Sequence, residues 1–419
     1  MSAPAKAKTK ASKDRTFAYE AVDLKGKRSK GTVEARDESG VAAALKSQGV
    51  TALFIQETGK GLQREITLPG FGPKVGLKDL AVFSRQFATM ATSGLSLLRS
   101  LTILEDQTEN QVLAKAVRDV RRDIETGQSL SGALGKHDIF PPIMVAMIRA
   151  GETGGFLDKA LERLAQNFEK DANLRAKIKS AMTYPVIVIC FSLLMITGVL
   201  IFIVPVFEHM FANLGGKLPL PTQIMVTLSH NALWILPVTA VLAFAAVKGI
   251  RSKLKQDPAW RLRFDALKLR VPVFGTLFTK IAISRFARNL GTLLSVGVPV
   301  MQALEVVGGT TGNAVIGDAM KDVANSVKQG QPMSAPLGDH PVFPQMVVQM
   351  IEVGEETGQI SAMLDKISDF YDHEVETATE SLTAAIEPLM VVVMGALIGV
   401  MVICLYLPMF SIYQNIGNQ

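Results

Sequence analysis

Three long runs of this chain contain no Asp, Glu, Lys or Arg, and they constrain the fold more than any other feature. They extend from Pro185 to Val204, from Ile224 to Val247 and from Leu389 to Phe410. At about 1.5 Å per helical residue, each run can cross roughly 30 Å of hydrocarbon. Buried core helices are the alternative, but they seldom run so far without a charge. The sequence therefore predicts three transmembrane helices.

The remainder of the chain contains an internal repeat. Phe83 recurs as Phe286 and Arg85 recurs as Arg288, in each case 203 residues later, and the correspondence continues into the apolar runs. Each copy has apolar residues near helical spacing, interrupted by Gly and Pro, with almost no strand signal. We therefore expect each copy to fold as an antiparallel bundle of about six helices.

Residues 15–57 differ from the repeats. Phe17 and Val33 flank a turn-forming segment, which predicts a β-hairpin. Residues 38–48 have the pattern of one amphipathic helix, and residues 50–55 have that of a returning strand. The pattern predicts a small α/β module.

The expected fold is an all-α polytopic membrane protein with two homologous cytoplasmic helical bundles, three transmembrane helices and this small N-terminal α/β module. The expected segments are a disordered basic tail (1–14), the α/β module (15–57), a linker (58–76), the first bundle (77–182), three spans (185–207, 222–247 and 388–410) and, before the third span, the second bundle (280–385).

The distribution of basic residues predicts the topology. Lys170, Arg175, Lys177 and Lys179 precede the first span and four more basic residues follow the second, whereas the loop between these spans contains only Lys217. The positive-inside rule therefore places both bundles in the cytoplasm. Two parallel repeats that each end in an outward-going helix also require one returning span between them. We expect the N-terminus inside and the C-terminus in the periplasm or outside the cell.

The first thirty residues contain nine Lys or Arg and three Asp or Glu, with no apolar run after them. A signal peptide is therefore not predicted. This basic tail suits anionic lipid headgroups. Nucleic acid is not expected as a partner, because no aromatic residues interleave with the charges. Cys190 and Cys404 both lie in apolar runs, which favours packing over a disulfide or a metal site.

An acidic motif is the sharpest local signal, with Glu152 in the first copy and Glu355 and Glu356 in the second. Comparing GETGG with GEETGQ indicates one inserted residue in the second copy, compensated by a gap soon afterwards. The flanking glycines permit a tight turn, and the acid can cap the amides of the next helix near its positive dipole end. The alternatives are a partner interface and a divalent-ion site, for which Glu152 and Asp158 alone provide too few oxygens.

Two arginines, Arg85 and Arg288, lie among apolar residues of predicted helices. Each can pair with an acid inside its bundle, which we favour, or reach a partner. With Glu152, Glu355 and Glu356 they are the candidate partner-interface residues. The chain has no GxxxxGK[ST], HExxH or CxxC motif, so no catalytic, cofactor or metal site is predicted. The absence of charges from the spans argues against an ion pathway.

Six short motifs carry a resemblance to a known family. They are Ser93-Gly94-Leu95, Ala150–Gly154, Thr183-Tyr184-Pro185, Val353–Gly358, Glu387-Pro388 and Tyr406–Phe410. With them, from about Thr16 to the end, the chain resembles the type II secretion F family, and within it the type IV pilus branch. The resemblance is specific because the duplicated domain, the unequal arrangement of spans and the small N-terminal module occur together.

The resemblance implies a scaffold, not an enzyme, in the bacterial inner membrane at the base of a pilus machine. The implied partners are cytoplasmic assembly or retraction ATPases, pilin subunits and other inner-membrane pilus components, and we expect a homo-oligomer. The type II secretion platform has the same architecture and is the alternative; a small transporter or membrane enzyme is more remote. The second copy has Gln359 and Glu387 where the first has Gly155 and Tyr184, so the bundles need not share partners.

Overall fold

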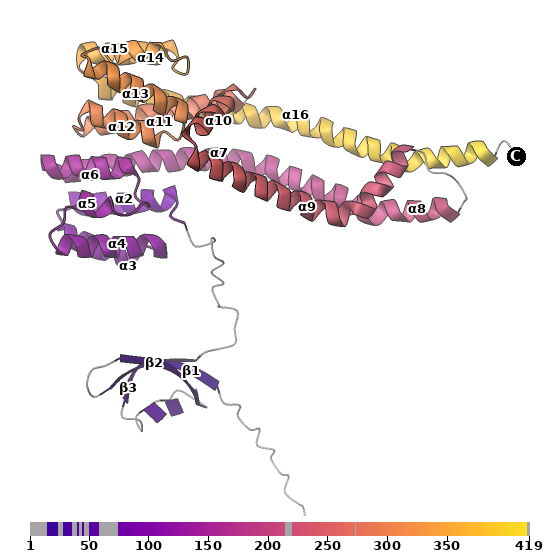
Figure 1. The fold of residues 1–419 in the computed structure, drawn as a ribbon, viewed down its shortest axis with the longest axis horizontal. Helices are drawn as coiled ribbons and strands as arrows, with labels where there is room; N and C mark the ends of the chain where they lie inside the picture. The colour runs from indigo at the N-terminus through magenta and orange to yellow at the C-terminus, as the bar shows by residue number, and fades with distance from the viewer. Residues whose placement is uncertain are drawn as a thin grey trace, which may run out of the picture. The chain divides into compact units, whose positions relative to one another are not determined.

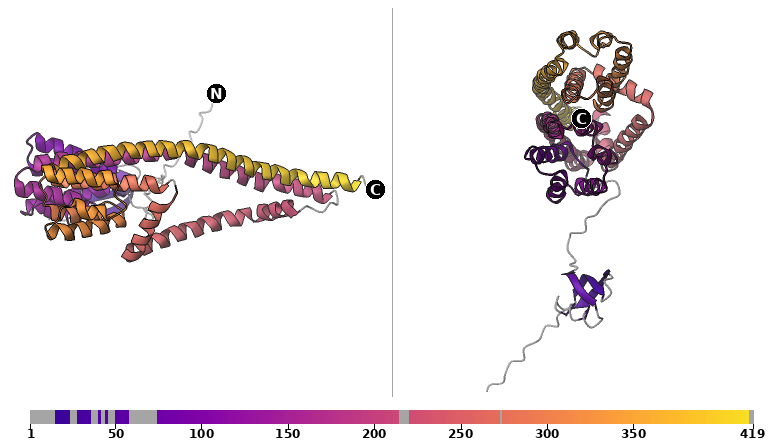
Figure 2. Two further views of the ribbon diagram at one scale, coloured as in Figure 1. Left: turned by 90° about the horizontal axis from the view of Figure 1, so that it is seen from above. Right: turned by 90° about the vertical axis from the view of Figure 1, so that its left-hand side faces the viewer.

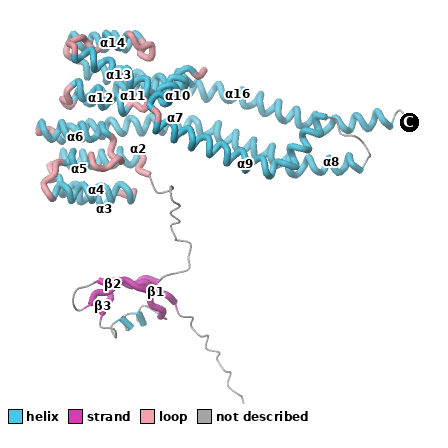
Figure 3. The backbone as a smooth tube through the Cα atoms, viewed as in Figure 1, coloured by secondary structure: helices cyan, strands magenta, loops and turns pink. Residues whose placement is uncertain are grey.

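The computed structural model describes residues 15–23, 28–35, 40–41, 44–45, 50–57, 74–213, 220–272 and 274–416. The chain forms two compact units, Met1–Gly72 and Pro73–Gln419. Within the described residues, the first unit contains strands, and the second is helical with short connecting loops (Figures 1 and 3).

The first unit contains a three-stranded antiparallel sheet in the order β2-β1-β3. Its strands are β1 (Arg15–Asp23), β2 (Arg28–Ala35) and β3 (Val50–Glu57). Phe17 lies opposite Val33 in the predicted hairpin, and Tyr19 lies opposite Ile55 of the returning strand. Most of the helix expected over residues 38–48 lies outside the described residues, so the complete α/β module stays a prediction.

Six helices make up each repeat in the described part of the second unit. The first repeat comprises α2 (Leu77–Thr92), α3 (Leu97–Gln107), α4 (Gln111–Glu125), α5 (Leu130–Leu134), α6 (Pro142–Gly154) and α7 (Leu157–Gly198). The second comprises α11 (Phe274–Ser295), α12 (Val300–Thr310), α13 (Ala314–Lys328), α14 (Ser334–Gly338), α15 (Gln345–Thr357) and α16 (Ile360–Ile416). Between them lie the π-helical turn η1 (Val199–Ile203), α8 (Val204–Asn213), α9 (Leu220–Gln256) and α10 (Pro258–Arg270).

Both repeats use the same residues to end and to cap their helices. Gly94 and Gly297 adopt left-handed backbone conformations, with φ angles of 76° and 74°, after the first helix of each repeat. Asn110 and Asn313 cap the third helix of each repeat by accepting backbone N–H groups through their side chains. These positions share the offset found in the sequence, so the two repeats follow the same chain path.

The two repeats share one hydrophobic core. Most of the buried apolar residues of the two repeats form a single contiguous cluster, which includes Phe83 and Phe87 from α2 and Phe286 from α11. Phe286 packs edge-on against Phe343, with ring centroids 5.0 Å apart. The bundles are therefore fused into one body, a feature that the separate sequence patterns did not predict.

Two long helices leave this body side by side (Figures 1 and 2). α7 has 42 residues and α16 has 57, which correspond to about 63 and 86 Å of helix. The described residues contain two helical stretches long and apolar enough to cross a membrane, Leu157–His209 and Ile360–Cys404, with mean hydropathies of 3.0 and 2.4 in their most apolar windows. The span predicted at 222–247 lies in α9 and stays a prediction.

Polar contacts join α9 to both long helical segments. The Thr222 hydroxyl donates to the Cys404 carbonyl of α16 at 2.6 Å, and the Ser229 hydroxyl donates to the Leu200 carbonyl of η1. Cys404 is buried in an apolar cluster with Val204. Such hydroxyl contacts and small-residue packing are typical of helices that associate within a membrane.

Candidate functional site

The two acidic motifs lie in the last turns of α6 and α15, and both glutamates cap a short helix. Glu152 accepts hydrogen bonds from the backbone N–H groups of Leu130 at 2.5 Å and Ser131 at 3.0 Å, at the start of α5. Glu355 accepts the equivalent pair at the start of α14 at the same two distances. The carboxylates thereby satisfy amides at a positive dipole end. The expectation that each acid caps the next helix is wrong. The capped helix is the one that precedes, in the chain, the helix that carries the acid.

This geometry also bears on the divalent-ion alternative for Glu152. Both carboxylate oxygens accept a backbone amide. Among the described residues, no three His, Cys, Asp or Glu side chains are grouped so that they could hold a metal ion. The arrangement therefore favours the cap.

The predicted insertion in the second copy is wrong. Gly155 is the C-cap of α6 and Gly358 is the C-cap of α15, and both have a left-handed backbone, with φ angles of 73° and 68°. These glycines keep the repeat offset, so Gly155 corresponds to Gly358, not to Gln359. A sequence comparison that pairs the Thr-Gly dipeptides introduces a false insertion, because only glycine suits the backbone that ends each helix.

Gly151 lets α6 approach α7 closely beside the cap. A Cβ atom at this position would lie 2.8 Å from the Cβ atom of Ala160 and 3.0 Å from the Cα atom of Leu157. At Gly354 a Cβ atom would lie 3.0 Å from the Cα atom of Ile360. The glycine before each acid therefore fixes the hairpin that positions the carboxylate.

Arg85 makes ion pairs inside its own bundle. Its Nε donates to Glu169 at 2.6 Å and its Nη1 donates to Glu162 at 2.7 Å, which joins α2 to α7. Hydrogen bonding from the Arg85 guanidinium lowers the pKa of both glutamates. This is the intramolecular pairing that the sequence favoured. A partner contact through Arg85 stays a prediction.

Arg288 occupies the equivalent place in the second repeat and is only 3% exposed. It donates to Asp372, the counterpart of Glu169, and to the Ser284 hydroxyl at 3.1 Å. Because the guanidinium is buried, contact with a partner would require this bundle to open. The charge at this position holds α11 against α16.

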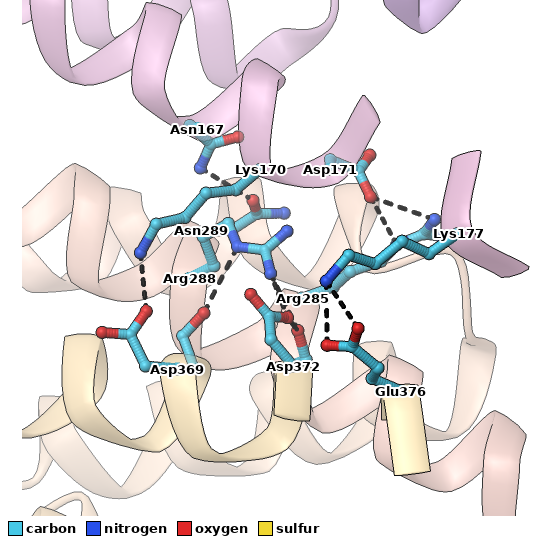
Figure 4. Close-up of polar contacts among 12 residues, drawn as sticks. Asn167, Lys170, Asp171, Lys177, Arg285, Arg288, Asn289, Asp369, Asp372 and Glu376 are labelled. Carbon is cyan, nitrogen blue, oxygen red and sulfur yellow. Dashed lines mark hydrogen bonds and ion pairs between the residues drawn. The ribbon is translucent and has the colours of Figure 1, made fainter. Parts of the chain in front are cut away.

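A row of ion pairs joins α7 of the first repeat to α16 of the second, and Figure 4 shows the pairs of Lys170 and Lys177. The basic residues come from α7 and the acidic residues from α16. The pairs are Arg163 with Asp365 at 3.6 Å, Lys170 with Asp369 at 2.6 Å and Lys177 with Glu376 at 2.8 Å. All six side chains are at least one-third exposed, so each pair contributes only about 0 to 1 kcal/mol. They line the seam between the two long helices.

Two polar contacts near this row are less exposed, and both run from α7 to α11. Asn167, which is 5% exposed, donates to the Thr292 hydroxyl at 3.1 Å. Asp171 pairs with Arg285 at 3.2 Å. Figure 4 shows Asn167 and Asp171 facing α11 from neighbouring turns of α7. A buried polar contact such as that between Asn167 and Thr292 is costly to break, so it helps to specify how the repeats dock.

Sequence reasoning did not find this row, although a signal was present. Arg163, Lys170 and Lys177 are spaced by seven residues, which places them on one face of a helix. The opposing acids precede the third apolar run. The charges of each segment taken alone bear only on topology, and their complementarity is visible only when the corresponding segments of the two copies are compared.

Comparison with known proteins agrees with the repeat. Residues 83–205 and residues 286–408 each match the family model described as "Type II secretion system (T2SS), protein F", and residues 14–56 match the model of that protein's N-terminal domain. The chain belongs to the type II secretion system protein F family. The two matched segments begin at Phe83 and Phe286, so the duplication in the family model is the duplication found in the sequence.

Relatives in this family are similar over nearly their whole lengths. The type IV pilus assembly protein PilC of Thermus thermophilus is 44% identical over 407 residues, covering 96% of this chain and 99% of the relative. PilC of Myxococcus xanthus is 42% identical, covering 98% and 99%. The type II secretion system protein F of Xanthomonas campestris is 31% identical, covering 96% and 99%.

Proposed function

We propose that this protein is the inner-membrane platform of a type IV pilus assembly machine, where it couples cytoplasmic ATPases to the insertion or extraction of pilin subunits. The relatives of higher identity are named type IV pilus assembly proteins, which favours the pilus over type II secretion. The type II secretion platform is the second candidate, because relatives with that name also align over nearly the whole chain.

The continuity of α7 and α16 is the observation that carries this proposal. Each helix begins in the fused cytoplasmic body and continues without a break into an apolar segment. The shared core and the row of ion pairs join the two helices to each other. A displacement of the body is therefore passed to both membrane segments together. Since the sequence has no phosphate-binding loop, the motion has to come from a partner that hydrolyses ATP.

The proposed topology has three spans, with the N-terminus in the cytoplasm and the C-terminus in the periplasm. The contacts of α9 with η1 and α16 support α9 as the returning span. Reporter fusions at Gly216 and after Gln419 should both report the periplasm. A cytoplasmic signal from either fusion would exclude this topology.

The partner surface is proposed to lie beside the acid caps. Glu356 is exposed, whereas its counterpart in the first repeat is the uncharged Thr153. The C-terminal ends of α6 and α15, beside the acid caps, are here called the two tips. They therefore offer different charges to an ATPase, to other pilus components or to another copy of this chain. The proposed homo-oligomer would bring several such tips together.

Coupling through α7 can be tested by interrupting the helix. Insertion of three glycines after Met182 should leave the protein in the membrane and still bound to the assembly ATPase, but should abolish surface pili, because a flexible joint does not transmit displacement. The same insertion after Gly216, between α8 and α9, is the matched control and should be tolerated. Normal piliation by the Met182 variant would refute coupling through α7. Loss of secreted hydrolases with normal pili would instead support the second candidate.

A further inference from the structure

The helix α10 lies outside both repeats, between α9 and the second bundle. One face of this helix is docked. Asp265, which is 5% exposed, accepts a hydrogen bond from the backbone N–H of Ala314 at 3.0 Å and so caps α13. Asp265 also pairs with Lys268 at 2.9 Å. The single acidic residue of α10 is therefore turned inward and used by the bundle.

The opposite face of α10 is exposed, and it mixes large apolar side chains with arginines. Trp260 is 44% exposed and Leu267 is 61% exposed. Arg263 and Arg270 are also exposed, and neither forms an ion pair with any residue that the structure describes. The four positions follow a spacing of three and four residues, which places them on one side of the helix.

This face lies close to where α9 would leave the membrane. The Lys253 Nζ atom of α9 lies 5.7 Å from the centre of the Trp260 ring. Lys253 is six residues beyond Val247, the end of the second predicted span, or about 9 Å along the helix. The headgroup layer is about 5 to 8 Å thick on each side, so the backbone of Lys253 lies at the outer edge of this layer. Figure 2 shows α10 crossing the direction of the long helices instead of extending it.

We infer that α10 is an interfacial helix whose exposed face, Trp260, Arg263, Leu267 and Arg270, binds anionic phospholipids of the cytoplasmic leaflet. An indole at headgroup level, an aliphatic side chain that enters the acyl boundary and unpaired arginines are the groups that such a surface recognises. Arginine also keeps its charged end in the headgroup layer while its stem covers apolar surface. The inference rests on the proposed three-span topology.

Lipid binding by α10 would restrict the movement of the second repeat. Since Asp265 joins α10 to the start of α13 by a hydrogen bond, the lipid contact would hold the second repeat against the membrane. The first repeat has no equivalent helix among the described residues. The platform would then be fixed to the bilayer on one side and free to be displaced on the other.

The two tryptophans of the chain, Trp234 and Trp260, allow a direct test in the full-length protein. Trp234 lies inside the predicted second span and is the internal reference. The W234F variant leaves Trp260 as the only indole, and the W260F variant leaves Trp234. Each is reconstituted in nanodiscs of phosphatidylcholine with or without phosphatidylglycerol, and fluorescence quenching is measured with acrylamide and with lipids brominated near the headgroup or near the chain end.

We expect Trp260 to be quenched by the shallow bromolipid and protected from acrylamide when phosphatidylglycerol is present. The R263Q/R270Q double variant should need a several-fold higher phosphatidylglycerol content for the same protection. The matched control, K115Q/R122Q, removes two exposed charges from α4 and should behave as the parent protein.

The outcomes distinguish a failure of this inference from a failure of the three-span topology on which it rests. If neither bromolipid quenches Trp234, the second span is wrong and the inference is overturned with it. If lipid quenches Trp234 while Trp260 stays open to acrylamide in every composition, the topology stands and the interfacial helix is overturned. Trp260 would also stay accessible to acrylamide if α10 were a docking site for another protein.

Discussion

Alanine at Glu152 or Glu355 removes the acceptors of two backbone N–H groups at the start of a five-residue helix. A helix of about one turn has few bonds of its own, so its cap matters more than the cap of a long helix. The surroundings differ between the repeats. In α5 the Ser129 hydroxyl still accepts a hydrogen bond from Gly132, at 3.1 Å. In α14 the N-cap residue is Met333, which provides no side-chain acceptor.

The expected loss of unfolding free energy in each variant follows from this difference between the repeats. Loss of a helix cap costs about 0.5 to 2 kcal/mol of unfolding free energy. We expect E152A to fall near 1 kcal/mol, because Ser129 remains, and E355A to fall near 2 kcal/mol. In a body of about 150 to 250 residues, 1 kcal/mol shifts the melting temperature by about 2 to 4 °C. The expected decreases are therefore about 3 °C for E152A and about 6 °C for E355A.

The assay is thermal unfolding of the full-length protein in detergent, with membrane abundance and surface pili measured in the same cells. Both variants should remain in the membrane, because about 1 or 2 kcal/mol is small against a typical folding free energy of 5 to 15 kcal/mol. We also expect the two variants to impair piliation unequally, because Thr153 and Glu356 give the two tips different charge.

Two neighbouring substitutions separate the cap from a partner contact. E356Q removes an exposed charge that caps no helix among the described residues, so it should leave the melting temperature unchanged and reduce piliation if this tip binds a partner. T153A is its counterpart in the first repeat. Equal decreases in melting temperature for E152A and E355A would refute the argument from Ser129. If E152A, E355A and E356Q are all piliated normally, the acids serve as helix caps and do not contact a partner.

Two further predictions concern the first bundle. Because Arg85 lowers the pKa of Glu162 and Glu169, their stabilising effect is complete well above the ordinary value of 4.5 and is lost as the pH falls below it. Thermal unfolding should show this acid loss in the parent protein and much less of it in R85Q. G151A should lower the unfolding free energy by about 1 to 3 kcal/mol through overpacking against α7. The control G395A, at which nothing lies within 4 Å, should be close to neutral, and a neutral G151A would contradict the close approach.

Local features of the fold were predictable because their causes lie within a few residues. Helical spacing, Gly and Pro breakers and Asn caps identify the helices of each repeat. Left-handed glycines such as Gly94 and Gly297 end helices wherever they occur. The fixed offset between the copies then shows that the same chain path is used twice. The candidate acids are predictable for the same reason, since a glutamate beside a turn glycine is a local pattern.

Features that depend on which faces meet were not predictable from one sequence. The shared core requires apolar faces of both repeats to point toward each other, and the helical period is the same whether a face meets its own bundle or another. Glu152 caps a helix that lies earlier in the chain, so its partner depends on how α6 folds back against α5. The local sequence around Asp265 is that of a surface acid on a basic helix, although the residue is buried against α13.

The row of ion pairs has a consequence for how the two repeats face a partner. Lys170 pairs with Asp369 and Lys177 pairs with Glu376, in each case 199 residues later in the chain, and Arg163 pairs with Asp365, 202 residues later, whereas equivalent residues of the repeats are 203 apart. The pairs therefore join non-equivalent positions of the two long helices. In every pair α7 supplies the basic side chain and α16 the acidic one. A partner that contacts this seam would meet basic side chains on one repeat and acidic side chains on the other, so sequence duplication here does not produce two equivalent surfaces.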